Sequence, residues 1–558
     1  MSLTTRITAI FKKPSNNLEE SDMHGKNLSG SNFKKANLSR SNLIEADLSG
    51  ANLRGANLYA AQLNMADLSK ADLAEASCID AEFNFADLSG ANLNRASFIG
   101  ADLRNAEFTG ASFRDTELNG ARLKKAVLKG IDLHKVDLSG ADLREADLSG
   151  ANLFKANLKG ADLRNANLTA ANLRGANLEE CNFSGTVLKQ TVLNQARLGD
   201  TNFEEADLES AAGLGKAHFF KTNFKKACLR GADLGGVEFA GSNLHKANLE
   251  NANLENADIN GINLKKAKLN NAMLCGVNLK NADLKNADLS GANLKRNMRK
   301  TFLTNANLEK ADLSGADLSG VDFTNANLSG ADLRGVILKD KYFSVDFRDA
   351  TLKDADLRNV DFRQINLDGI NLENANLYES DLRGSSLNKA NLSYANLNRS
   401  RLAKAGYKKT RLEEANLEKA SLRETDLREA CLKKANLGYA DLSHTNLRGA
   451  DLTGSDLWKA SLLEADLRKA DLREANLGFA GLIRSRMGGF MAGTNLKNAS
   501  LIQTDLRQAR NLKFRQLQKT RTLFMAGLDE ELLEQIQKRK PQLLLKPDLA
   551  DQKKTVRL

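Results

Sequence analysis

Apolar residues return at every fifth position along most of this chain. In ANLFKANLKGADLRNANLTA, residues 151–170, they are Leu153, Leu158, Leu163 and Leu168. The residue two before each leucine is Ala, the residue directly before it is Asn or Asp, and the two that follow are mostly polar. The repeating unit is therefore A-(D/N)-L-x-x, and we call its leucine the centre.

A period of five residues fits neither common element, because an amphipathic helix repeats at about 3.6 residues and a strand at about two. Asn, Asp and Gly are also poor helix formers. A square coil fits better: four five-residue sides make one 20-residue turn, with Ala and Leu inside and the polar residues outside. Successive coils would stack through backbone hydrogen bonds, as neighbouring strands do. The pattern predicts that residues 20 apart lie one above another.

The units A-D-L-S-G, A-N-L-R-G and A-D-L-R-E resemble the pentapeptide-repeat family of right-handed quadrilateral β-helices, over residues 16–511. The resemblance implies an all-β solenoid of about 25 coils with short helical caps at its ends. It implies function only weakly, because function resides in sites carried by a fold.

The two ends depart from the repeat. Residues 1–15 form an amphipathic pattern that predicts a cap, or alternatively a membrane-surface anchor. Residues 512–545 predict a closing segment with a cap helix, which acidic residues begin and Pro541 ends. Residues 546–558 have the composition of a disordered basic tail. Several small members of the family pair through their C-terminal ends, so the resemblance also implies that this end could form a homodimer.

The five-residue register breaks four times. We interpret residues 209–214 as one residue too many, and residues 294–303, 343–347 and 487–496 as steps that are one residue short. On this interpretation Met298, Phe343 and Met491 are centres that point inward. The breaks are either neutral drift in a tolerant array or features that shape a docking surface.

Aromatic residues at one-coil spacing predict stacks inside the tube. Phe183, Phe203 and Phe224 should stack along one side once the extra residue is counted, and Phe219 should meet Phe239 along another. We assign these rings to core packing.

Chemistry-bearing residues do not converge anywhere in the sequence. The five histidines lack metal-ligand spacing, and neither a nucleophile elbow nor a phosphate-binding glycine loop occurs. We therefore expect no catalytic residue, cofactor or metal, and no enzyme activity. The five cysteines form no C-x-x-C pair; Cys78 and Cys181 occupy inward positions. Isolated thiols, with no signal peptide or spanning segment, favour the cytoplasm.

One corner carries a run of cations, within a chain whose net charge is +11. The centres at 224, 244, 264 and 284 are preceded by Asn223, Asn243, Asn263 and Asp283. They are followed by the candidate face for an anionic partner: Lys225, Lys226, His245, Lys246, Lys265, Lys266 and Lys285. Like charges on stacked strands repel one another. This face is either a binding surface or a solvated corner that keeps the protein soluble.

Two further ladders carry charge. Lys408, Arg428, Arg448 and Arg468 form a secondary basic ladder, with Asp426 and Asp466 beside it. Arg104, Lys124, Arg144 and Arg164 form another, which Asp102, Asp142 and Asp162 should neutralise.

These patterns predict a non-enzymatic binding or scaffolding protein. The expected partner is a protein with an acidic surface, or else an anionic lipid head group; nucleic acid is disfavoured because the lysine corner lacks stacking aromatics. The resemblance implies two alternatives. Modulation of topoisomerases by imitating DNA requires an acidic surface, which the basic charge disfavours. A secreted bacterial effector is the other, and its signs are the cluster Glu530, Glu531 and Glu534 near the C-terminus and the short tail that follows.

Overall fold

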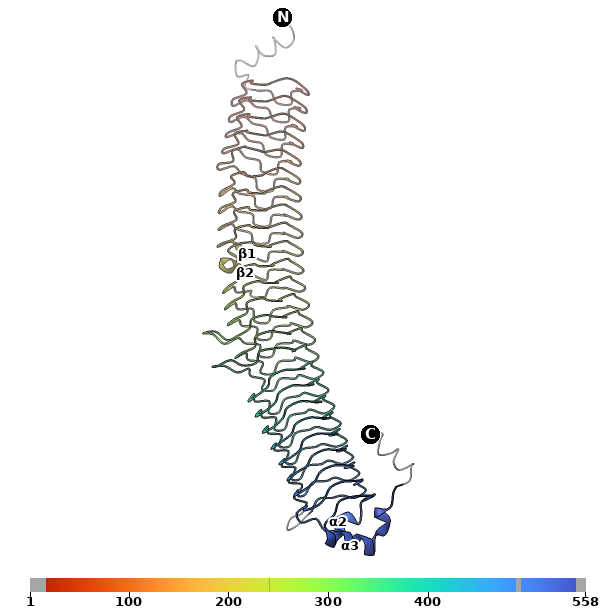
Figure 1. Ribbon diagram of the computed structural model, residues 1–558. Coiled ribbons are helices and arrows are strands. Elements are labelled where there is room, and N and C mark those ends of the chain that lie inside the picture. Colours follow the sequence, from red (N-terminus) through yellow and green to blue (C-terminus); the bar gives the residue numbers. More distant parts are fainter. Residues whose placement is uncertain (1–16, 240, 488–492, 548–558) are drawn as a thin grey trace. The chain divides into compact units, whose positions relative to one another are not determined.

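The structure is a computed structural model that describes residues 17–239, 241–487 and 493–547. The expected N-terminal cap, residues 1–15, and residues 548–558 of the expected tail lie outside them. The chain divides into two compact units, Met1–Asn278 and Leu279–Leu558, and each is a stack of four-sided coils (Figure 1). The fold is a right-handed quadrilateral β-helix, as predicted. Among the described residues, no helix combines the length and apolarity that a membrane crossing requires.

Each five-residue side ends in a tight turn, and one side of the first unit illustrates it. Leu48 and Ala51 are buried, and the Ala51 N–H donates to the Leu48 carbonyl at 3.0 Å. Gly50, the third residue of this turn, has φ 62°, which is the mark of a type II turn. The Asp47 carboxylate accepts the Ser49 N–H at 3.0 Å. Asp or Asn therefore precedes the centre because its short side chain holds the corner.

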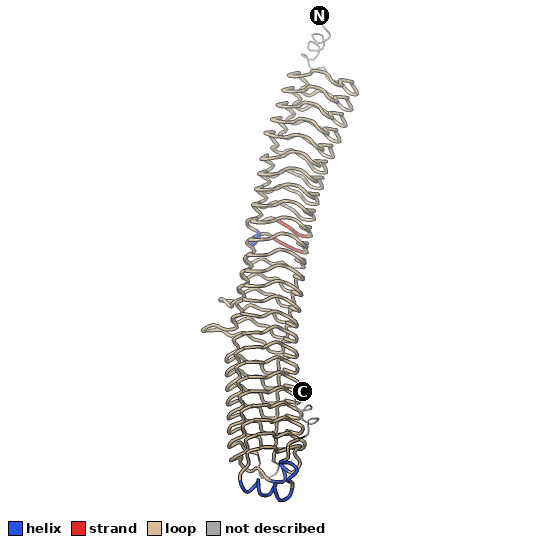
Figure 2. Tube along the Cα trace, turned by 45° about the vertical axis from the view of Figure 1, so that its right-hand side comes forward, coloured by secondary structure: helices blue, strands red, loops and turns tan. Residues whose placement is uncertain are grey.

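Neighbouring coils are joined by parallel backbone bridges. The regular bridge joins positions 20 residues apart in sequence, as Asn37 and Asn57 are, and we call this spacing the regular offset. The Leu38 N–H donates to the Asn57 carbonyl at 2.7 Å, and the Asn57 N–H donates to the Ala36 carbonyl at 2.9 Å. The Asn57 side-chain amide also donates to the Asn37 side chain at 3.0 Å. Because each side contributes one such bridge, the ladders are rows of isolated bridges with few regular strands (Figure 2).

The first unit absorbs one extra residue. Val192 bridges Ala212 at the regular offset, but Arg197 pairs with His218, one position later than that offset. Strands β1 (Arg197–Gly199) and β2 (His218–Phe220) flank this coil, and the 3-10 helix η1 (Leu214–Lys216) turns its corner. Leu214 is buried, as the register predicts.

The second unit contradicts the expected short steps at its first two breaks. Asn293 bridges Asp317, four positions later than the regular offset, whereas Phe302 bridges Asp322 at the regular offset. The coil between 294 and 303 is therefore longer than the others by an insertion, and Met298 is 101 % exposed. The expectation of an inward Met298 is wrong, because the coil keeps all four sides and expels the surplus as a loop.

The break at 343–347 follows the same rule. Asp322 bridges Asp346, again four positions later than the regular offset, and both Leu338 and Phe347 are buried centres. Phe343 is not a centre; it belongs to a small hairpin in which Lys339 and Ser344 pair antiparallel. Both insertions project from the stack of the second unit (Figure 1).

A third insertion of the same length lies near the end of the stack. Asp466 bridges Arg486 at the regular offset, whereas Asp471 bridges Asn495 four positions later than that offset. Met487 is a buried centre, and Met491, expected to be another, lies outside the described residues.

The expected aromatic stacks are present. Phe183 and Phe203 stack at 4.9 Å between ring centroids, and Phe203 and Phe224 at 5.1 Å, with interplanar angles of 11° and 5°. Phe219 meets Phe239 at 4.9 Å, tilted by 47°.

Short helices close the C-terminal end. They are α2 (Phe514–Leu517), α3 (Glu530–Arg539) and the 3-10 helix η2 (Pro541–Leu544). The bridges continue to Gly527, and the Leu523 N–H donates to the carbonyl of Leu543 at 2.7 Å. Chain from η2 thus takes the place of a further coil, which covers an otherwise open strand edge.

Tyr407 occupies a centre position, is fully buried, and its hydroxyl has no hydrogen-bond partner. We expect Tyr407→Phe to stabilise the protein by about 1 kcal/mol, because a buried unpaired hydroxyl costs about 1–3 kcal/mol. The measurement is the urea midpoint of unfolding. Tyr394→Phe, at a tyrosine that is 51 % exposed, is the control and should leave the midpoint unchanged. A lower midpoint for Tyr407→Phe would contradict the assignment.

Candidate functional site

The lysine face comprises Lys225, Lys226, His245, Lys246, Lys265 and Lys266, all in the first unit. Its residues stack as predicted, because the Lys226 N–H donates to the His245 carbonyl and the Lys246 N–H to the Lys265 carbonyl, both at 2.9 Å. Successive pairs are therefore one coil apart, roughly 4.8 Å. The geometry brings these cations into one column along a single corner.

Asparagines keep this column positive. Asn243 accepts the His245 N–H at 3.1 Å and donates to the Asn223 side chain at 3.2 Å. Asn263 accepts the Lys265 N–H at 3.2 Å. These amides perform the turn-closing task of Asp47, but they carry no charge. The residues that precede these centres therefore supply no carboxylate to the corner.

Two of the lysines have acidic partners, although the residues that precede the centres supply none. Lys225 pairs with Glu204 at 2.8 Å, and Lys226 with Glu205 at 2.5 Å. The hydrogen bond from Lys225 lowers the pKa of Glu204. Sequence reasoning missed both glutamates because it examined the residues before each centre and not those after the centre of the preceding coil.

Lys285 stands apart from the other candidates. It belongs to the second unit, where it pairs with Glu309 at 2.7 Å. The uncompensated part of the lysine face is thus its middle: within the described chain, no ion pair engages Lys246 or Lys266.

His245 reports the electrostatics of this middle. Its imidazole is half-buried, and Nδ1 has no hydrogen-bond partner. Burial, followed by the nearby charges of Lys246, Lys266 and Lys225, lowers the pKa of His245 below its ordinary value of 6.5. Both causes disfavour a further positive charge here. The column therefore already presents a positive potential without that proton.

The ladder of Arg104, Lys124, Arg144 and Arg164 shows the opposite design. Arg104 pairs with Asp102 at 2.5 Å, Arg144 with Asp142 at 2.7 Å, and Arg164 with Asp162 at 2.6 Å; Lys124 pairs with Glu145 at 3.2 Å. Its charge is cancelled within the ladder, as the sequence predicts.

The secondary ladder of Lys408, Arg428, Arg448 and Arg468 is intermediate. The Lys409, Glu429 and Gly449 N–H groups bond to the carbonyls of Arg428, Arg448 and Arg468, so this ladder is also one column. Arg428 pairs with Asp426 at 2.7 Å and Arg468 with Asp466 at 2.5 Å. Asn446 takes the corresponding place beside Arg448 and accepts its N–H at 3.2 Å. Half of this charge is therefore neutralised locally.

No catalytic or metal constellation emerges in the part of the chain that the structure covers, where no three His, Cys, Asp or Glu side chains cluster as metal ligands would. Cys78 and Cys181 are buried as predicted, and burial raises the pKa of Cys78 well above its ordinary value and that of Cys181 to about 12. Such thiols are small core residues with little thiolate character.

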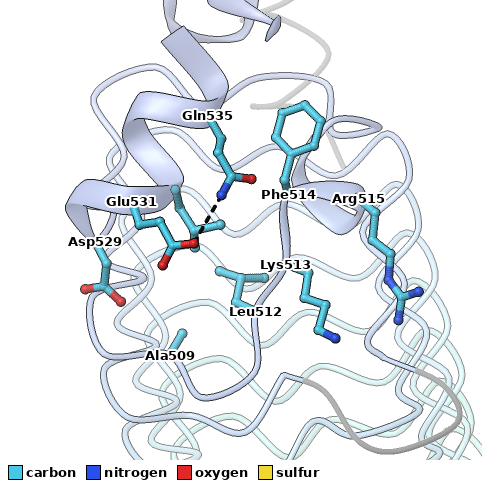
Figure 3. A pocket seen from close by; sticks show the side chains of 9 residues that line it. Ala509, Leu512, Lys513, Phe514, Arg515, Asp529, Glu531 and Gln535 are labelled. Carbon is cyan, nitrogen blue, oxygen red and sulfur yellow. Dashed lines mark hydrogen bonds between the residues drawn. The ribbon is translucent and has the colours of Figure 1, made fainter. Parts of the chain in front are cut away.

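A pocket of about 490 Å³ lies at the C-terminal end (Figure 3). Leu512 and Phe514 line it together with Asp529, Glu531 and Gln535. Gln535 donates to Glu531 at 3.3 Å, and the Asp529 carboxylate accepts the Gln508 N–H at 3.0 Å. Asp529 and Glu531 lie at the start of α3, where negative charge stabilises a helix. Helix capping therefore explains these two carboxylates, and we assign them no catalytic or binding role.

Comparison with known proteins agrees with the fold. The family model described as "Pentapeptide repeats (8 copies)" matches residues 17–74, 76–169, 171–209, 217–296, 303–340, 344–402 and 410–489. The gaps at 297–302 and 341–343 fall in the two projecting insertions. A comparison with curated proteins gave no match.

Solved structures of similar proteins include three of interest. HetL, a pentapeptide repeat protein involved in heterocyst differentiation regulation from the cyanobacterium Nostoc sp. strain PCC 7120, is 32% identical, covers 52% of this chain and 90% of its own, and has a TM-score of 0.12. A pentapeptide repeat protein from the Arabidopsis thaliana thylakoid lumen is 32% identical, covers 20% and 70%, and has a TM-score of 0.12. QnrB1, a plasmid-mediated fluoroquinolone resistance protein, is 21% identical, covers 46% and 98%, and has a TM-score of 0.16.

The lysine face makes a titration prediction. His245 should titrate below 6.5, and Lys246→Ser with Lys266→Ser should raise its pKa, because two of the charges that oppose protonation are removed. The measurement is an NMR titration of the imidazole C–H signals, assigned with His245→Gln. The unfolded chain takes up this proton more readily, so His245 should also reduce stability as the pH falls through 6.5. If the pKa of His245 is the same in the double variant as in the natural chain, Lys246 and Lys266 do not raise the positive potential at this histidine.

Proposed function

Because the chain belongs to the pentapeptide-repeat family, we propose that it is a non-enzymatic binding protein, acting in the cytoplasm, whose lysine face contacts an acidic surface of a protein partner. The observation that carries the proposal is the middle of that face, where His245, Lys246 and Lys266 stack beside neutral asparagines.

The cost of this arrangement supports a binding role. Like charges on neighbouring strands destabilise a sheet, by up to about 1 kcal/mol per pair. The same chain neutralises the ladder at Arg104, Arg144 and Arg164 with aspartates in the corresponding positions. A solvated corner needs no such column, whereas a partner's carboxylates would supply the missing counter-charge on binding.

The chemistry of the face favours a protein partner. Single-stranded nucleic acid is bound by cations interleaved with stacking rings, and the lysine face contains no Phe, Tyr or Trp side chain. The backbone bonds of the column hold successive cationic residues one coil apart, roughly 4.8 Å. A folded acidic surface can match that spacing without paying for its own ordering.

A charge-matched comparison tests the proposal. Lys246→Ser, Lys265→Ser and Lys266→Ser together should abolish retention of the partner when the tagged chain is purified from its native cells and eluted with a salt gradient. The control replaces Lys124, Lys125 and Lys159 with Ser; these lysines pair with Glu145 and Glu180, and the change in net charge is the same. Equal recovery of every co-purifying protein from both variants would refute the role of the lysine face.

The same triple variant should also be more stable than the natural chain at low salt, because it relieves repulsion within the column. Its urea midpoint should rise, and the gain should disappear at about 1 M salt, where charges are screened beyond about 3 Å. A midpoint that falls, or a gain that persists at high salt, would show that the lysines do not repel one another.

A further inference from the structure

One corner of the second unit carries a groove that the regular repeat does not produce. Its volume is about 690 Å³. Five cations line this corner groove, and Glu424 is the one carboxylate among its lining residues. The cations are Lys339, Arg363, Arg383, Lys404 and Arg423.

The hollow exists because a ladder of long side chains is interrupted. The Gln364, Gly384 and Lys404 N–H groups donate to the carbonyls of Arg383, Ala403 and Arg423, so these residues follow one another up the corner. Arginine occupies the position after the centre in three of these coils, but Ala403 takes its place in the coil between Arg383 and Arg423. The short side chain leaves an open floor.

The arginines that border the hollow are held in place. Arg363 bonds to Asp361 through Nε and a terminal nitrogen, at 2.9 and 2.6 Å, and Arg383 bonds to Asp381 in the same way. At the far end, Arg423 lies 3.4 Å and Lys404 3.7 Å from Glu424. Arg363 and Arg383 each keep further N–H donors for a ligand, because a guanidinium has five and the bonds to aspartate use two.

The hairpin inserted at 339–344 closes the other end of the corner groove. The Lys339 ammonium donates to the Arg363 carbonyl. The insertion after centre 294 braces the hairpin, since Lys295 pairs with Asp340 at 3.0 Å and the Arg296 guanidinium lies 4.4 Å from the centroid of the Phe343 ring. Lys295, with the N–H groups of Phe343 and Tyr342, lowers the pKa of Asp340 to about 2. The two insertions therefore form one interlocked wall.

We propose that the corner groove binds an extended acidic segment of a protein partner through its carboxylates. Charge complementarity selects this occupant, since the five cations outnumber the three carboxylates beside them, Glu424 in the lining and Asp361 and Asp381 behind the arginines. No aromatic ring lines the hollow, so stacked bases are not accommodated.

Carboxylates suit the corner groove better than phosphates do. Asp361 and Asp381 stand directly behind the arginines, and Glu424 lies at the end. The two aspartates already use two donors of Arg363 and of Arg383, so each guanidinium offers a ligand only its remaining N–H groups, which one carboxylate can accept. An extended segment can set one carboxylate against each arginine, because alternate side chains of a strand share a face.

The experiment measures binding of a fluorescein-labelled twelve-residue peptide of alternating Glu and Ser to the full chain by anisotropy, with a Gln/Ser peptide and a phosphoserine/Gly peptide as comparison probes. Ala403→Arg restores the missing rung and fills the hollow. We expect it to weaken binding of the Glu/Ser peptide at least about tenfold, a change of about 1.4 kcal/mol, although it adds a positive charge. Lys404→Ser should also weaken binding, without filling the site.

Leu463→Arg is the matched control. It places an arginine at the same corner position two coils beyond Arg423, at a residue that is 37 % exposed. We expect this variant to bind the Glu/Ser peptide as the natural chain does, and both arginine variants to keep the natural urea midpoint. Tighter or unchanged binding by Ala403→Arg would overturn the proposal, because attraction to the surface at large would then suffice.

Two further outcomes decide the assignment. Tighter binding of the phosphoserine peptide, lost in Ala403→Arg, would overturn the choice of carboxylates and assign the corner groove to phosphopeptides. The triple serine variant of the lysine face should bind the Glu/Ser peptide normally. If it does not, the peptide binds the lysine face and the corner groove is not its site; this result leaves the proposed function intact.

Discussion

The backbone hydrogen bonds that join each coil to the next are the constraint on which the whole protein depends. The Leu38 N–H reaches the Asn57 carbonyl, and the Asn57 N–H reaches Ala36, only because equivalent positions of successive coils are held one above another. Buried backbone groups without partners are costly, so a coil that slips by one residue loses its bonds on every side. The inward leucines and alanines hold the spacing by filling a narrow interior, and the turn residues hold the corners. Neither contribution suffices without the other.

This constraint explains where the chain tolerates irregularity. The insertions between 294 and 303 and between 338 and 347 leave the bridges on both sides intact, and the surplus residues leave the stack as loops. Closing a short extra loop costs a modest amount of entropy. A side that is one residue short would instead lose its backbone hydrogen bonds to the coils before and after it. Variation is therefore confined to the surface, and the loops that accumulate there define surfaces that the plain repeat lacks.

The residue before each centre has two tasks, and their separation controls surface charge. Asp and Asn both accept the N–H two residues on, as Asp47 and Asn243 do. Only Asp also neutralises a cation after the centre, as Asp142 does for Arg144. A column of asparagines therefore leaves a column of lysines without that local counter-charge, and the fold does not change. Single exchanges between Asp and Asn can therefore set the charge along a corner without altering the structure of the coil.

The sequence by itself determined the coil, its inward residues and the vertical alignment of equivalent positions in successive coils, because a five-residue period repeated over most of the chain leaves one economical way to bury the centres. It therefore also placed the three stacked phenylalanines and the lysines of the central column. Only the tertiary structure decided what touches these columns from neighbouring coils. Glu204 and Glu205 reach Lys225 and Lys226 through long side chains whose direction the repeat does not specify. Met298 and Phe343 looked like centres because they are apolar, but the backbone bonds of complete coils outweigh the burial of one side chain. One end of the corner groove likewise depends on a hairpin whose Lys339 lines the groove and which a second insertion contacts through Lys295 and Asp340, a contact that no local pattern encodes.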